Sequence, residues 1–62
     1  MKYKTGDTVS FIESNTHLLG TIDGETMKMA REIVYLIKIT ENEIWKGMAV
    51  WKTESRLTKV IR

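Results

Sequence analysis

Apolar and polar residues alternate at the start of the chain. In residues 8–12 (TVSFI), Val9 and Phe11 occupy alternate positions between polar neighbours. Successive side chains of a strand point to opposite faces, so this pattern predicts a half-buried strand with Val9 and Phe11 inside. The polar run at residues 13–16 (ESNT) has the composition of a loop.

A second strand is predicted at residues 18–22 (LLGTI), where apolar residues resume. An Asp-Gly dipeptide follows at residues 23–24, and this pair is a strong turn signal, so we expect the strand to end there. Gly20 lies within the strand, where a glycine indicates a bulge or the close approach of another backbone.

The clearest strand is the run IVYLIKIT at residues 33–40, which is dense in β-branched and aromatic residues. We expect it to be central in the sheet, and one of its faces carries Ile33, Tyr35, Ile37 and Ile39. A short polar turn at residues 41–43 leads into IWKGMAVW at residues 44–51. The two apolar runs therefore predict a hairpin.

The last part of the chain predicts a turn and a short strand. Residues 52–56 (KTESR) favour a helical or 3₁₀ turn, and residues 57–61 (LTKVI) favour a final strand. The whole pattern then predicts an all-β fold of five strands, with a turn before the last one.

Residues 25–31 leave an alternative open. Met27, Ala30, Val34 and Ile37 follow one another at spacings of three, four and three, which is helical periodicity. Several residues here are good helix formers, so a helix near residues 25–35 would make the fold α+β. The β-branched residues from Ile33 onward favour the all-β interpretation.

The length of 62 residues allows one hydrophobic core, and no linker composition divides the chain, so we expect a single domain over residues 1–62. Hydrophobic residues make up 42% and charged residues 29% of the chain, a balance typical of globular proteins. There is no cysteine. Disulfides are therefore excluded, and a reducing, cytoplasmic location is expected. No apolar run is long enough to span a membrane.

Several segments together resemble small SH3-like barrels of the KOW and Tudor type. They are GDTVSF at residues 6–11, Gly-Thr-Ile at 20–22, the long hairpin, and WKTESRLTKV at 51–60. The resemblance covers nearly the whole chain and implies a five-stranded, partly open barrel with a 3₁₀ turn before the last strand. It assigns no ligand, because the Ala-Leu-Tyr-Asp-Tyr signature of signalling SH3 domains is absent and the spacing from Gly6 to Gly20 is long for a KOW motif.

Charge is unevenly distributed, although the formal net charge is only +2. From residue 46 onward one acid, Glu54, accompanies five basic residues, whereas the preceding part has seven acids and five basic residues. If the last strands lie side by side, the five basic residues would form one positive surface. They are Lys46, Lys52, Arg56, Lys59 and Arg62.

Two tryptophans add a second candidate feature. In an extended strand, Trp45, Gly47, Ala49 and Trp51 share one face, which would place two large rings on either side of a shallow floor. Such a surface could stack a base or hold a peptide. In the alternative, Gly47 marks a bulge that changes the alternation, and at least one tryptophan enters the core.

Catalytic and metal sites have little support in the sequence. Ser10, Ser14, His17 and Asp7 supply the atom types of a nucleophilic site, but none of the serines lies in a nucleophile-elbow context. The single histidine and the absence of cysteine argue against zinc. We therefore expect no enzyme activity and no cofactor.

Two classes of binding function remain. The first is nucleic-acid binding, with the five basic residues meeting phosphates and Trp45 or Trp51 stacking on bases. The second is a protein-interaction or adaptor module, including a homodimer, that uses an exposed strand edge and the same aromatic residues. Salt dependence separates the two, because phosphate contacts weaken steeply as ionic strength rises.

Overall fold

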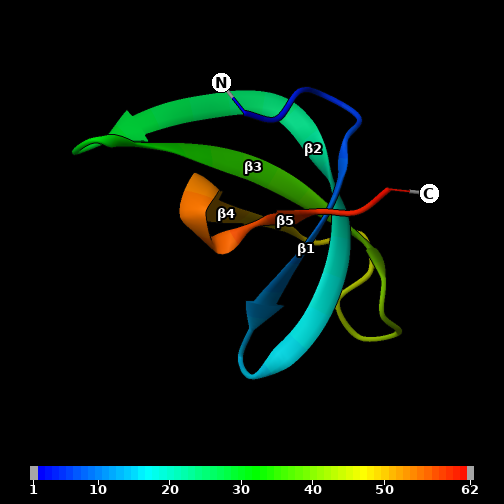
Figure 1. The fold of residues 1–62 in the computed structure, drawn as a ribbon. Coiled ribbons are helices and arrows are strands. Elements are labelled where there is room, and N and C mark those ends of the chain that lie inside the picture. Colours follow the sequence, from blue (N-terminus) through cyan, green and yellow to red (C-terminus); the bar gives the residue numbers. More distant parts are fainter. Residues whose placement is uncertain (1, 62) are drawn as a thin grey trace.

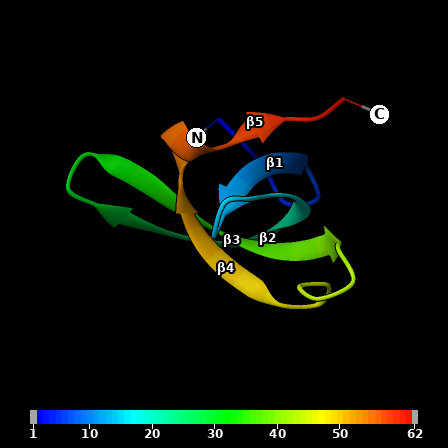
Figure 2. The same cartoon turned by 90° about the horizontal axis from the view of Figure 1, so that it is seen from below.

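Five antiparallel strands form one sheet in the computed structural model, which describes residues 2–61. The elements are β1 (Thr8–Glu13), β2 (Thr16–Met29), β3 (Glu32–Glu41), β4 (Ala49–Thr53), the 3₁₀ turn η1 (Glu54–Arg56) and β5 (Thr58–Lys59). Their order in the sheet is β4-β3-β2-β1-β5 (Figures 1 and 2). The all-β prediction and the turn before the last strand are confirmed. The alternative helix near residues 25–35 is wrong, because these residues belong to β2, a tight turn and β3.

The second strand is much longer than predicted and curves strongly along its length (Figure 1). It does not end at the Asp-Gly pair: Ile22 pairs with Ile37 and Thr26 with Tyr35, so three residues of β2 oppose one of β3. This irregularity is a β-bulge, and Gly24 occupies it with φ +91°. The turn signal thus marks a bend within β2, which lets the strand pair with β1 near its start and with β3 along most of its length.

Gly20 combines the two roles expected of it. The pairing of β2 with β3 shifts register between Leu19 and Gly20. A Cβ atom at Gly20 would lie 2.6 Å from Cγ2 of Ile37 and 2.6 Å from the carbonyl oxygen of Lys38. The strands can therefore approach each other here only because the side chain is absent.

The core lies on the concave side of the curved sheet. Its members are apolar or aromatic residues from every strand except β4 and β5, together with residues of the connecting segments: Tyr3, Val9, Phe11, Leu18, Ile22, Tyr35, Ile37, Ile39 and Leu57. Ile33, Trp45 and Val50 are half-buried against it. The predicted inward positions of β1 and β3 are confirmed, with Ile33 only partly covered.

A buried hydrogen-bond network connects the segment before β1 to β3 and η1. The hydroxyl group of Tyr35 donates to Glu54 Oε2 (2.5 Å) and accepts from the backbone N–H of Tyr3 (3.2 Å). The hydroxyl of Tyr3 donates to the carbonyl oxygen of Leu57 (3.0 Å). Burial and the bond to Glu54 raise the pKa of Tyr35, whereas the same bond and the backbone N–H of Lys2 lower the pKa of Glu54.

The sheet is not closed into a barrel, because β4 and β5 remain its two edges. An ion pair spans the open side: Nζ of Lys52 on β4 lies 2.5 Å from Oε1 of Glu13 at the end of β1. The sheet is therefore curved enough to bring β4 and β1 within reach of each other's side chains, although two strands separate them in the sheet order.

One part of the molecule projects away from the core. The second half of β2, the turn and the first residue of β3, residues 23–32, are exposed throughout, and Figures 1 and 2 show the end of the β2–β3 hairpin extending away from the rest of the sheet. We call these residues the hairpin arm. Ala30 has φ +54° in the turn at its tip.

Candidate functional site

The predicted strand over residues 44–51 is wrong in its first half. Residues 43–47 form turns, and β4 begins only at Ala49. Asn42 produces this turn, because its side-chain oxygen accepts hydrogen bonds from the backbone N–H groups of Ile44 (2.9 Å) and Trp45 (3.0 Å). An asparagine that bonds to the backbone ahead of it competes with strand pairing. The polar turn before β4 is consequently longer than its composition indicates.

The two tryptophans therefore do not share a face. Trp45 lies in the turn and is half-buried against the core. Trp51 lies in β4, pairs with Leu36 of β3, and is 42% exposed. The alternative, in which a bulge at Gly47 sends one tryptophan into the core, is met only in part: Trp45 packs half-buried against the core, but a turn and not a bulge places it there. The predicted strand that would have put both rings on one face is absent from residues 44–48.

Trp51 belongs instead to an apolar surface on the convex side of the sheet. The register pairs Trp51 with Leu36 and Val34 with Met27, and all four residues lie on the face opposite the core. Val34 is only 3% exposed although it is outside the main core. We call the face that carries these four residues the outer apolar face.

The edge of β4 lies directly beside this face. The backbone N–H of Ile39 donates to the carbonyl oxygen of Met48 (2.8 Å), so the backbone groups of Ile39 point to β4. Hydrogen bonding alternates along an antiparallel pair. The backbone groups of Val50 and Lys52 therefore point to β3, and those of Trp51 point to the side where, within residues 2–61, no strand pairs.

The predicted basic surface is not assembled as expected. The last two strands lie at opposite edges of the sheet and not side by side. Lys52 is paired with Glu13, and Nζ of Lys59 lies 3.7 Å from Oδ2 of Asp7. Lys46 and Arg56 are exposed at opposite ends of β4, and Arg62 lies outside the described residues.

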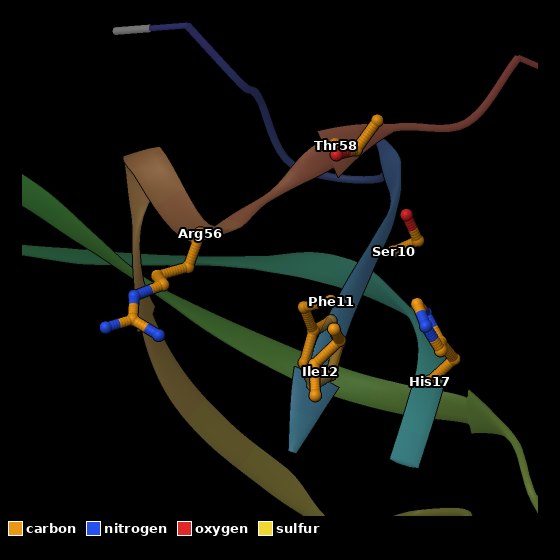
Figure 3. Close-up of a pocket in the computed structure, with 6 residues that line it drawn as sticks. All are labelled: Ser10, Phe11, Ile12, His17, Arg56 and Thr58. Carbon is orange, nitrogen blue, oxygen red and sulfur yellow. The ribbon is translucent and has the colours of Figure 1, made fainter. Parts of the chain in front are cut away.

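A pocket of about 210 Å³ lies beside β1, near the point where β5 begins. Six residues line it: Ser10, Phe11, Ile12, His17, Arg56 and Thr58. Figure 3 shows Arg56 and His17 on opposite sides of Phe11 and Ile12. We call this hollow the β1 pocket. Of its lining, Arg56 was a candidate phosphate contact, whereas Ser10 and His17 were considered only as parts of a nucleophilic site; strand pairing brings Ser10, Ile12, His17 and Thr58 together here.

The outer apolar face could have been found from the sequence of residues 33–40, where only the face with Ile33, Tyr35, Ile37 and Ile39 was considered. Val34 and Leu36 are apolar, although they alternate with the inward residues of β3. A strand that is apolar on both faces indicates burial or binding on both sides. Met27 had no comparable signal, because its pairing with Val34 depends on the bulge in β2.

Other kinds of site are not found in the part of the chain that the structure describes. Residues 2–61 contain no cluster of histidine, cysteine, aspartate or glutamate that could hold a metal ion. Within the same residues, no helix is long and apolar enough to cross a membrane. Comparisons of the chain with protein-family models, curated proteins and solved structures gave no match.

Proposed function

We propose that this chain is a non-catalytic protein-interaction module, in which the edge of β4 and the outer apolar face receive an extended segment of another protein. The partner strand would pair with the backbone of β4 at Trp51. Its side chains on the convex side would then pack against Trp51 and Leu36. Backbone pairing gives affinity in this mode, and side-chain contacts give specificity.

The proposal includes the finer description of the fold as SH3-like, of the KOW and Tudor type. Three features support it: the strand order β4-β3-β2-β1-β5, the long bent β2 that pairs with both β1 and β3, and the 3₁₀ turn before β5. Barrels of this kind commonly serve as scaffolds for binding, and the function is argued from the surface and not from the fold.

The observation that carries the proposal is the position of Trp51. Its ring is 42% exposed on an apolar surface, and its backbone groups face an edge without a partner strand in residues 2–61. Tryptophan is enriched among the residues that dominate protein interfaces. Unpaired strand edges are the part of a sheet to which another chain adds most readily.

Nucleic-acid binding is the second candidate function, and one observation favours it. Lys38 pairs with Ala49 and so lies on the same face as Trp51, where a cation and an exposed ring could hold a phosphate and a base. We rank it second because two of the expected phosphate contacts, Lys52 and Lys59, already pair with carboxylates.

The test compares the unmodified protein with Trp51→Ala and with Lys46→Gln as a control in the β3–β4 turn. Each is used to capture proteins from nuclease-treated lysate at low and high salt, and each is titrated with a fluorescent oligothymidine. If the surface binds a protein, a captured protein should remain bound after nuclease treatment and at high salt. Lys46→Gln should capture it as well, whereas Trp51→Ala should lose it although the variant itself still melts cooperatively. The partner would then be identified, and its binding segment would be mapped onto β4 by NMR.

Two results would contradict the proposal. If Trp51→Ala captures the same protein as strongly, the surface does not lie at Trp51. If the unmodified protein binds the oligothymidine with a steep salt dependence and Trp51→Ala weakens that binding, the second candidate replaces the first.

A further inference from the structure

We propose that the β1 pocket binds a carboxylate side chain carried by an extended peptide segment, which pairs with the edge of β1 at Ile12. This inference goes beyond the proposed function, because the pocket is formed by residues of β1, β2, η1 and β5 and does not include Trp51 or the edge of β4. It assigns a ligand chemistry to a second place in the molecule.

The first argument is the short length of β5. The backbone N–H of Val60 donates to the carbonyl oxygen of Thr8 (2.9 Å), and Ser10 pairs with Thr58. Because hydrogen bonding alternates along β1, the N–H and C=O of Ile12 point to the same side as those of Thr8 and Ser10, which face β5. Within residues 2–61, β5 does not reach Ile12, since β5 begins only at Thr58 and the residues before it form η1. One donor and one acceptor are therefore directed to the place where another strand would continue β5.

The second argument is the charge around this edge. Arg56 is exposed and lines the pocket, and no ion pair or hydrogen bond joins its side chain to another residue in the range 2–61. No acidic residue of that range lines the pocket, and the nearest acid along β1, Glu13, is engaged with Lys52. A guanidinium group matches the two oxygens of a carboxylate in geometry as well as charge.

The third argument is the chemistry and size of the hollow. Ile12 is 53% exposed and offers apolar surface between Arg56 and His17, while Ser10 and Thr58 supply hydroxyl groups (Figure 3). The volume of about 210 Å³ is below the range of roughly 300–1,000 Å³ of small-molecule sites. The space suits one or two side chains of a peptide, whose main chain would use the edge at Ile12.

The experiment uses the ¹⁵N-labelled protein and a pair of end-blocked hexapeptides. One has the sequence Thr-Val-Thr-Asp-Val-Thr, and the other carries Asn in place of Asp. The proposal expects shifts of the amide signals of Ile12, His17 and Thr58, slower hydrogen exchange at Ile12, and binding of the Asp peptide about tenfold tighter than that of the Asn peptide. Charge-assisted hydrogen bonds are strong enough to give a preference of this size.

Two Arg→Gln variants test whether the preference for the Asp peptide depends on Arg56. Arg56→Gln should bind both peptides about equally, whereas Arg31→Gln, at the tip of the hairpin arm, should keep the preference for Asp. Retention of the native amide spectrum shows that each variant is folded.

Several outcomes would overturn the inference. One is the absence of any shift at Ile12 at millimolar peptide, and another is an equal loss of preference in the two variants. If sodium acetate alone produces the same shifts and the same slowed exchange, the pocket is a simple anion site and strand pairing at Ile12 is wrong.

Discussion

The two ends of the β2–β3 pair belong to one ladder but differ completely in burial. At one end, Ile22, Ile37 and Ile39 are buried in the core. At the other end, the hairpin arm of residues 23–32 is exposed on both faces. Strand geometry in the arm therefore depends mainly on backbone pairing with the start of β3 and on the tight turn, whereas strand geometry near the core is also fixed by packing on both strands. The β2–β3 pair can therefore keep strand conformation at an end where few side chains are buried, while most of the stability that side-chain burial supplies comes from the other end.

The largest expected effect is at the core end of this pair. Ile37 is fully buried, so Ile37→Ala leaves a cavity and should cost about 2–5 kcal/mol. A domain of this size has about 3–5 kcal/mol of stability, so the variant should be largely unfolded. Urea denaturation followed by circular dichroism measures the change. Near-native stability would show that the core is less tightly packed than its burial indicates.

The next effect concerns the close approach at Gly20. In Gly20→Ala the added methyl group meets Ile37 and a backbone carbonyl that cannot move aside, and we expect a loss of about 1–3 kcal/mol. Gly47→Ala is the control: Gly47 has φ +88° but no atom near the new Cβ, so only the backbone conformation is penalised, by about 1 kcal/mol. Equal melting temperatures of the two variants would contradict the role of packing at Gly20.

A pH-dependent effect is expected from Glu54. Its pKa in the folded state is lowered by the hydrogen bonds from Tyr35 and Lys2. A lowered pKa contributes stability above the ordinary value of 4.5, and this contribution is lost as the pH falls through the folded-state value. The melting temperature of Glu54→Gln should therefore fall less on acidification than that of the unmodified protein. Glu25→Gln, the same change in the hairpin arm, should follow the unmodified protein. An identical acid profile for Glu54→Gln would refute this assignment.

The smallest effect is expected in the arm itself. Met29 is 57% exposed on β2 opposite Glu32, so Met29→Thr removes little buried surface and should change stability by less than about 0.5 kcal/mol. Thermal melting of Met29→Thr and Ile37→Ala side by side compares the contributions of the two ends of the β2–β3 pair to stability. A loss above about 1 kcal/mol would mean that the tip of the arm at Met29 contributes packing energy.

The sequence predicted the parts of the fold that depend on local alternation. Val9, Phe11, Tyr35 and Ile37 are inward as their spacing required. The missed features depend on contacts between distant residues or on hydrogen bonds from side chains. The Asp-Gly pair could not show that β3 would continue the pairing beyond it, and Asn42 gave no sign that its side chain would hold Trp45 in a turn.

The candidate site was less predictable than the fold for the same reason. Trp51 was identified from its residue type, but its neighbours on the outer apolar face follow from strand register. Arg56 was identified as a cation, yet its place beside Ile12 depends on where β5 begins. The residue type alone can identify a candidate binding residue, but the strand register determines which candidates lie beside one another.

The hydrogen bond from Tyr3 to Leu57 has a consequence for the rate of folding. It joins residues 54 positions apart, and β5 pairs with β1 across a similar separation. Contacts of this kind close loops of about 50 residues, and loop-closure entropy opposes them while the intervening chain is still disordered. Folding is therefore expected on the millisecond-to-second scale of non-local β topologies, with the union of β1 and β5 among the latest steps.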